Sequence, residues 1–133
     1  MAQRLGLHGS HLLDTWAIIH HVENLADIAA KLPELVKQLK KPAQKDAYSL
    51  INGVHDYYLE TMKAYYNADR ALADKIAGQR VALVDSHKKL ITSHPDLATV
   101  EFSTSLTSMA SLIADISRVV IDAASSGTSP ASQ

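Results

Sequence analysis

Apolar side chains recur along this chain at alternating intervals of three and four residues, and this spacing constrains the fold more than any other feature. Such intervals place the apolar residues on one face of an α-helix and are typical of helices packed in a bundle. The first segment carries them at Ile18, Val22, Leu25, Ala29, Leu32, Val36 and Leu39, and the last at Phe102, Leu106, Met109, Ile113, Ile116, Val120 and Ala123. Both segments are predicted to be long amphipathic helices.

Helix-breaking signals divide the chain into four predicted helices. The first begins after Ser10 as N-cap and ends at Lys41-Pro42, and Pro33 in its interior predicts a kink or a short second helix. The others are predicted over 44–67, 70–92 with Asp69 as the cap, and 97–124 after the break His94-Pro95-Asp96; the expected apolar face of the second is Ala47, Ile51, Val54, Tyr58, Met62 and Tyr65. The sequence predicts an all-α antiparallel bundle of about four helices over 1–124, with a disordered tail over 125–133.

Composition excludes several classes of protein. The chain has 133 residues, 47% of them hydrophobic, which suits one globular domain. Its net charge of −1 lacks the basic excess of a nucleic-acid-binding protein. The absence of cysteine excludes disulfides and fits a cytoplasmic protein. No apolar stretch is expected to reach the length of a membrane span, so neither direct nucleic-acid binding nor membrane insertion is predicted.

A lone carboxylate occurs twice in an apolar helical setting, as Asp27 and as Asp115. Glu23 precedes Asp27 by one helical turn, so the two carboxylates share a face. Carboxylates in this arrangement are candidate ligands for a divalent or ferric ion, and Glu23, Asp27 and Asp115 are the candidate metal-binding residues. The simpler interpretation is two solvated helix faces with Asp27–Lys31 and Asp115–Arg118 as surface ion pairs.

No catalytic machinery is recognisable in the sequence. The chain has no glycine-rich phosphate loop, nucleophile elbow or His-Glu-x-x-His zinc pattern. We therefore predict no catalytic residue and no cofactor-binding residue, and we do not expect an enzyme.

Three stretches resemble the PhoU family of phosphate-uptake regulators, in particular the C-terminal part of an archaeal form with an AbrB-like DNA-binding domain. The family signature Glu-Arg-Ile-Ala/Gly-Asp reads Glu23-Asn24-Leu25-Ala26-Asp27 here. Residues 62–73 are similar to the joint between two long helices of that family, and 105–122 to its closing helix. The resemblance covers residues 5–124.

The resemblance implies an architecture of two similar three-helix units, of which this chain would hold the last helix of one and all of the next. It also implies that Glu-x-x-x-Asp pairs bind metal clusters on the bundle surface. Glu23 and Asp27 keep such a pair, whereas Ser111 stands where the acid before Asp115 belongs, and Asn24 replaces the arginine of the signature.

We expect a non-catalytic regulatory helical domain of a phosphate-uptake or phosphate-signalling regulator, which acts by contacting a regulatory or transport-system protein. The alternatives are a metal-binding helical bundle that uses surface carboxylates, and an oligomerisation module of a DNA-binding regulator. Apolar residues outside the main faces predict a two-fold homodimer. They are Leu13, Trp16 and Ile19 in the first helix, and Leu112 and Val119 in the fourth.

Overall fold

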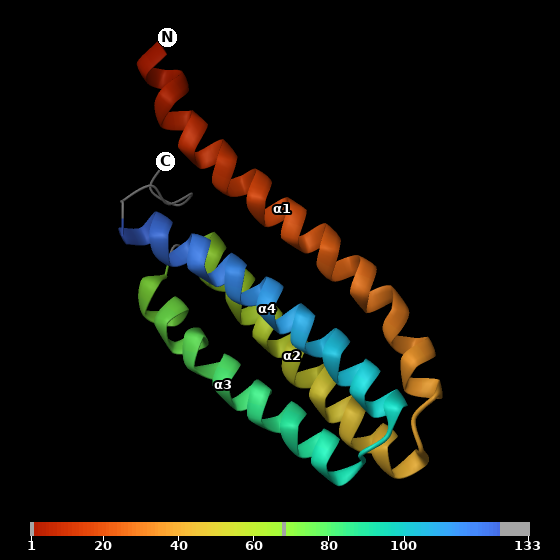
Figure 1. Ribbon diagram of the computed structural model, residues 1–133. Coiled ribbons are helices and arrows are strands. Elements are labelled where there is room, and N and C mark those ends of the chain that lie inside the picture. The colour runs from red at the N-terminus through yellow and green to blue at the C-terminus, as the bar shows by residue number, and fades with distance from the viewer. Residues whose placement is uncertain (1, 68, 126–133) are drawn as a thin grey trace.

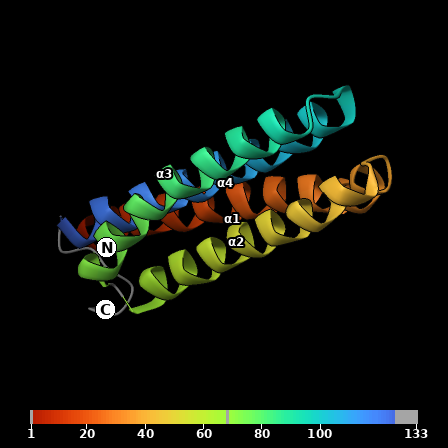
Figure 2. The same cartoon turned by 90° about the horizontal axis from the view of Figure 1, so that it is seen from below.

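Four helices run alternately up and down in the computed structural model, which describes residues 2–67 and 69–125 (Figure 1). They are α1 (Ala2–Lys37), α2 (Lys41–Asn67), α3 (Arg70–Ser93) and α4 (Leu97–Ser125). Their axes lie close to parallel (Figure 2), and no strand occurs in the described ranges. The prediction of an all-α antiparallel helical bundle is confirmed.

Short polar caps fix the starts of α3 and α4. The Asp69 carboxylate accepts a hydrogen bond from the backbone N–H of Leu72 at 3.0 Å. The Asp96 carboxylate accepts one from the Thr99 N–H and one from the Thr99 hydroxyl, each at 2.9 Å. Both helices begin where the sequence predicts, because these side chains satisfy N–H groups that the first helical turn leaves free. Of the predicted tail, Ser125 belongs to α4, and 126–133 lie outside the described residues.

The predicted limits of α1 are wrong at both ends. The helix begins at Ala2, so Ser10 is not an N-cap, because an interior serine does not stop a helix whose preceding turns can form hydrogen bonds. The helix ends at Lys37, and Lys41-Pro42 opens α2 instead of closing α1. Proline suits that first turn, where its missing N–H is not needed.

Pro33 lies inside α1, which continues past it to Lys37. The prediction of a short second helix at this proline is therefore wrong. Proline removes one hydrogen bond from the helix interior. Leu32 and Val36 are both buried on either side of it, and this packing holds the segment helical.

The core has α4 at its centre. This helix packs against all three others, whereas α1 packs mainly against α4 and meets α2 at few places. The predicted face of α4 is buried from Phe102 to Val120, with Met109 half-buried. In α2 the buried positions are Ala43, Ala47, Leu50, Val54, Tyr57, Thr61 and Ala64. The predicted face of α2 was therefore misplaced by about one residue, since four of its six members lie beside the core and not in it.

Among the described residues, the segment Leu97–Asp122 of α4 is long and apolar enough to cross a membrane by length and composition. The sequence-based expectation that no stretch reaches such a length is therefore wrong. The core helix of a bundle passes the same test, and α4 contacts every other helix of this one.

Candidate functional site

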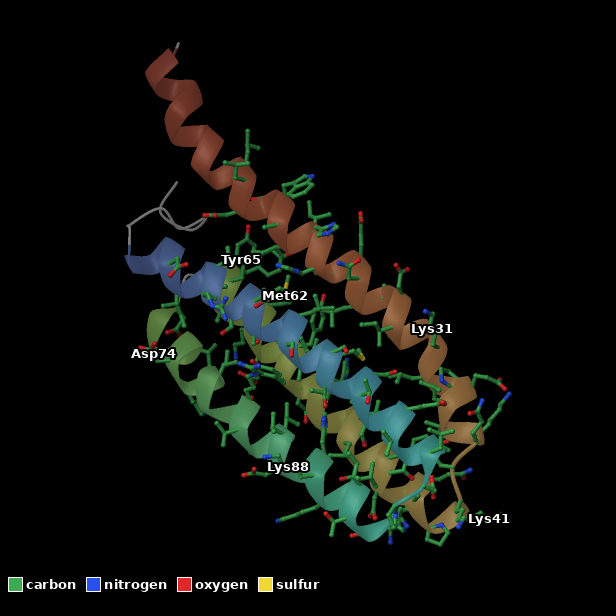
Figure 3. All side chains as sticks on the ribbon, in the orientation of Figure 1. Lys31, Lys41, Met62, Tyr65, Asp74 and Lys88 are labelled. Atoms are coloured by element: carbon green, nitrogen blue, oxygen red, sulfur yellow. The ribbon has the colours of Figure 1, made fainter. Side chains whose placement is uncertain are left out.

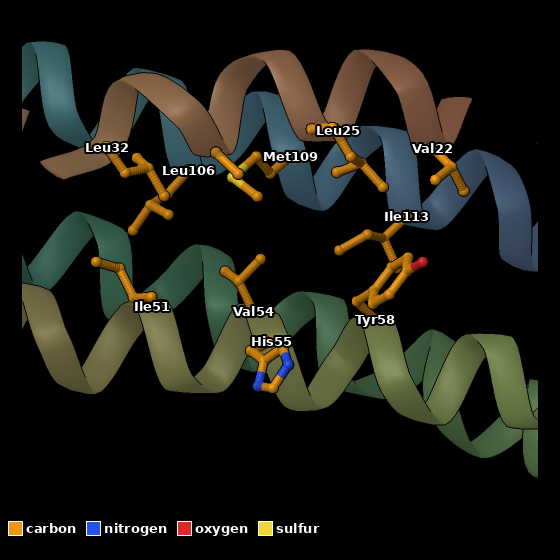
Figure 4. A pocket seen from close by; sticks show the side chains of 12 residues that line it. Val22, Leu25, Leu32, Ile51, Val54, His55, Tyr58, Leu106, Met109 and Ile113 are labelled. Carbon is orange, nitrogen blue, oxygen red and sulfur yellow. The ribbon is translucent and has the colours of Figure 1, made fainter. Parts of the chain in front are cut away.

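An apolar groove of about 320 Å³ separates α1 from α2. The groove exists because α1 packs mainly against α4 and contacts α2 at few places. The lining residues are Val22, Leu25, Ala26, Ala29 and Leu32 from α1, Ile51, Val54, His55 and Tyr58 from α2, and Leu106, Met109 and Ile113 from α4. Side chains from all three helices point into this space, whereas the His55 ring points away from it (Figure 4). The groove therefore has α1 and α2 as its two walls and α4 as its base.

Side-chain hydrogen bonds bridge the two walls beyond each end of the groove. At one end, the Thr15 and Tyr65 hydroxyls lie 3.3 Å apart. At the other, the Gln44 amide donates to the carbonyls of Leu39 at 3.0 Å and Val36 at 3.3 Å. Met62 and Tyr65 lie on the side of α2 that faces α1 (Figure 3). These bridges tie α1 to α2 while the middle of the groove stays open.

Both walls of the groove carry a second line of side chains at three- and four-residue intervals. On α1, the outer seam is Leu12, Thr15, Ile19, Val22, Ala26 and Ala29; on α2, the outer seam is Tyr48, Ile51, His55, Tyr58, Met62 and Tyr65. Every member is exposed or half-buried. The half-buried apolar members pack against the edge of the core, and the others face solvent. Heptad spacing on a face that the core covers only in part is typical of a helix that can pack against a further helix.

The outer seam of α1 continues past the groove as an exposed apolar surface. Leu12, Leu13, Trp16 and Ile19 have exposed fractions of 62%, 69%, 65% and 51%. The Trp16 ring stacks on His20, with ring centroids 5.4 Å apart. The first turns of α1 project beyond the ends of the other helices (Figure 1). Since soluble monomers seldom expose such a group of large side chains together, this surface is a candidate contact site.

The other two residues of the expected contact surface lie elsewhere. Leu112 and Val119 are partly buried and pack against the core. Neither is exposed as Leu13, Trp16 and Ile19 are, although other positions of α4, such as Leu97 and Val100, face solvent. The exposed residues that line the groove belong to α1 and α2. The α2 contribution was missed because its outer seam is displaced by only one residue from the buried one, and both have the same spacing.

The candidate metal ligands lie on two different helices. Glu23 and Asp27 are exposed on α1, and Asp115 lies on α4, where its carboxylate is 3.7 Å from the Arg118 guanidinium. Within the described ranges, no group of three or more histidine, aspartate or glutamate side chains could hold a metal ion. The structure therefore shows the expected Asp115–Arg118 surface pair and does not bring the three carboxylates together. Metal binding by Glu23 and Asp27 stays a prediction.

One histidine lies inside the bundle. His87 on α3 is 3% exposed, and its Nδ1 is 2.9 Å from the Thr107 hydroxyl of α4. Its Nε2 is buried with no hydrogen-bond partner. Burial lowers the pKa of His87 below its ordinary value, because the interior disfavours the charged imidazolium. This side chain therefore links the packing of α3 on α4 to pH.

The chain shows no match to a known family model, to a curated protein or to a solved structure.

Proposed function

We propose that the chain is a non-catalytic regulatory domain that acts by helix docking, and that a second copy of the chain occupies the groove between α1 and α2. The observation that carries this proposal is the pair of outer seams on the groove walls. Two separated helices with an apolar base between them form a groove that can bind a third helix, as in the recognition of helical peptides by hydrophobic grooves. Ala26 and Ala29 on the α1 wall leave room for a close approach by another backbone.

A second copy of the chain supplies the helix that the groove requires. The exposed seam of α1 is apolar and has the heptad spacing of a helix that could pack between the groove walls. The same surface of the chain could therefore supply both the inserted helix and the groove. Such self-complementarity is what a two-fold interface needs. The proposed dimer lays α1 of one chain beside α2 of its partner.

Charge at the edges of the two walls supports the same occupant. Glu23 and Asp27 are exposed beside the outer seam of α1, whereas Lys45 and Lys63, together with Asp56, are exposed beside that of α2. Laying α1 on the partner's α2 brings an acidic edge against a more basic one. Complementary edges favour association and fix its register.

A role in phosphate-uptake regulation in the cytoplasm remains part of the proposal through the PhoU-like stretches at 23–27, 62–73 and 105–122. In that setting the docked helices would transmit a signal by shifting the conformation of a regulatory or transport-system protein. The proposed dimer rests on the groove and its outer seams, so it can be tested whether or not the chain regulates phosphate uptake.

The test is the mass of the chain in solution, measured by light scattering and sedimentation over a concentration series. The wild-type chain is expected to be a dimer, and Trp16→Glu is expected to raise the dissociation constant by roughly 30-fold or more, as loss of a large aromatic contact at an interface does. Val81→Glu is the matched control, because Val81 on α3 is 64% exposed and lies away from the groove.

A second pair of variants tests the groove itself. Ala26→Glu places a charge on the groove wall, and Ala82→Glu places the same charge at an exposed position of α3. Only the first is expected to dissociate the dimer. A wild-type chain that stays monomeric at high concentration, or a dimer that Ala26→Glu leaves intact, contradicts the proposal.

A further inference from the structure

A second cavity, of about 200 Å³, lies among α2, α3 and α4, apart from the groove. Tyr57 of α2, Arg80 of α3 and Ser117 and Arg118 of α4 line it, with Ala114 and Ile121 as its apolar wall. Three helices thus line one small space with two arginines and two hydroxyl-bearing residues. Arg80 and Arg118 are both exposed, so the space opens to solvent. Of these donor residues, Tyr57 and Ser117 are buried and the two arginines lie at the opening.

The hydroxyl of Ser117 is one of four buried side-chain polar atoms that have no hydrogen-bond partner in the described ranges, and Ser117 is the one of these residues that lines the cavity. Ser117 is 4% exposed, and its hydroxyl has no hydrogen-bond partner among the described residues. A buried polar group without a partner destabilises the fold unless something satisfies it. Since Ser117 lines the cavity, a group bound there would be within its reach.

The charges around the cavity favour an anion. The Arg118 guanidinium is 3.7 Å from the Asp115 carboxylate, whereas the ion pairs found in the described ranges do not include Arg80. Arg80 therefore brings to the cavity a positive charge that no carboxylate of the described ranges neutralises within ion-pair distance. Burial raises the pKa of Tyr57, the Arg80 charge lowers it and the Asp115 charge raises it, so the phenol stays protonated and acts as a hydrogen-bond donor.

We infer that this cavity binds a small tetrahedral oxyanion of the phosphate or sulfate class. Guanidinium groups bind oxyanions through paired N–H donors. Four donor groups on three helices suit an ion with oxygens on all sides better than a planar carboxylate. The volume is below the roughly 300 Å³ at which pockets for larger organic ligands begin, so the ion itself or the phosphoryl group of a small ester is the ligand that fits.

Inorganic phosphate is the probe for the test, with thermal unfolding and titration calorimetry as the two measurements. Phosphate is expected to raise the melting temperature above that in chloride or acetate at the same ionic strength, and sulfate to act like phosphate. Glycerol phosphate added in a parallel titration distinguishes the sources, because tighter binding of the ester assigns the site to an organic phosphate. Stabilisation by acetate equal to that by phosphate would overturn the inference.

Variants assign the binding to the cavity. Arg80→Gln and Arg118→Gln are each expected to weaken phosphate binding by about tenfold or more, the loss typical of a hydrogen bond to a charged group. Lys88→Gln removes the same charge from an exposed position of α3 and is expected to leave binding unchanged. An equal loss in Lys88→Gln would show a general charge effect and would contradict the site.

Ser117→Ala gives a readout that a merely structural role would not produce. Removing the unpaired hydroxyl is expected to raise the melting temperature of the phosphate-free chain and, at the same time, to weaken phosphate binding. A variant that is more stable but binds phosphate as tightly as the wild type removes Ser117 from the site. Since the cavity lies within one chain, the outcome does not depend on whether the groove forms a dimer.

Discussion

Helices α1 and α4 share the same apolar spacing, yet the structure uses them differently. In α4 the seam from Phe102 to Val120 is enclosed because three helices surround it. In α1 the inner face packs on α4, while Leu12, Trp16 and Ile19 face solvent. The apolar spacing therefore identifies a helix that can pack against others, and the number of neighbouring helices decides how much of its apolar surface is buried. An apolar residue in this chain can belong to the core or to a contact surface with no difference in local pattern.

The largest contrast is expected from one substitution made in both regions. Ile113→Ala opens a cavity at a position with no exposed surface and is expected to lower the free energy of unfolding by about 2–5 kcal/mol. Ile19→Ala, at a position that is 51% exposed, is expected to change it by less than about 0.5 kcal/mol. Urea unfolding at a concentration where the chain is monomeric measures both. Similar losses at the two sites would mean that α1 is enclosed in solution.

Acid is expected to weaken the enclosed region through His87. The pKa of His87 is lowered in the folded chain, so the unfolded chain takes up a proton first as the pH falls. The free energy of unfolding should be unaffected well above the ordinary histidine pKa of about 6.5, and should fall as the pH drops below it. His87→Gln keeps a partner for Thr107 but does not titrate. Urea midpoints from about pH 7.5 to about pH 5.5 should therefore fall more steeply in the wild type than in this variant.

Gln44→Ala tests how α1 is held to the rest of the bundle. The Gln44 amide donates to the carbonyls of Val36 and Leu39, near the end of α1. Its loss is expected to cost about 1 kcal/mol. Hydrogen exchange should accelerate in α1 more than in α4, because only α1 depends on this contact. Equal acceleration in the two helices would contradict the distinction between them.

The smallest expected effect concerns two glycines in helix interiors. At Gly78 an added Cβ meets no neighbour within 4 Å, so Gly78→Ala should stabilise the chain by roughly 0.5–1 kcal/mol. At Gly53 the same Cβ would lie 3.0 Å from Leu83 Cδ2. Gly53→Ala should therefore gain less or be destabilising, since α2 and α3 approach closely there. Thermal unfolding of both variants tests whether the α2–α3 contact is as tight as the structure has it.

The helix starts that the sequence predicts correctly are those set by capping contacts between near neighbours in the chain. Asp69 and the break at His94-Pro95-Asp96 predicted the starts of α3 and α4, because a cap is a contact between near neighbours. At Pro33 the sequence left a kink and a short second helix open, and the continuous α1 excludes the second. The burial of Leu32 and Val36 on either side of the proline is a tertiary property that the sequence does not give. The same limit applies to α2, where two faces one residue apart have the same spacing and only packing selects Tyr57 over Tyr58 for the core.

The sequence by itself determined an all-helical chain, the apolar face of α4 and most of the buried face of α1, since helical periodicity and capping are properties of short segments. Only the tertiary structure decided that α1 packs against α4 and is separated from α2 by a groove. The position of a helix depends on how all its neighbours fill the space around it. The same holds for the cavity at Arg80, Ser117 and Arg118. Its donors come from three successive helices, and no spacing along the sequence predicts which of their residues meet.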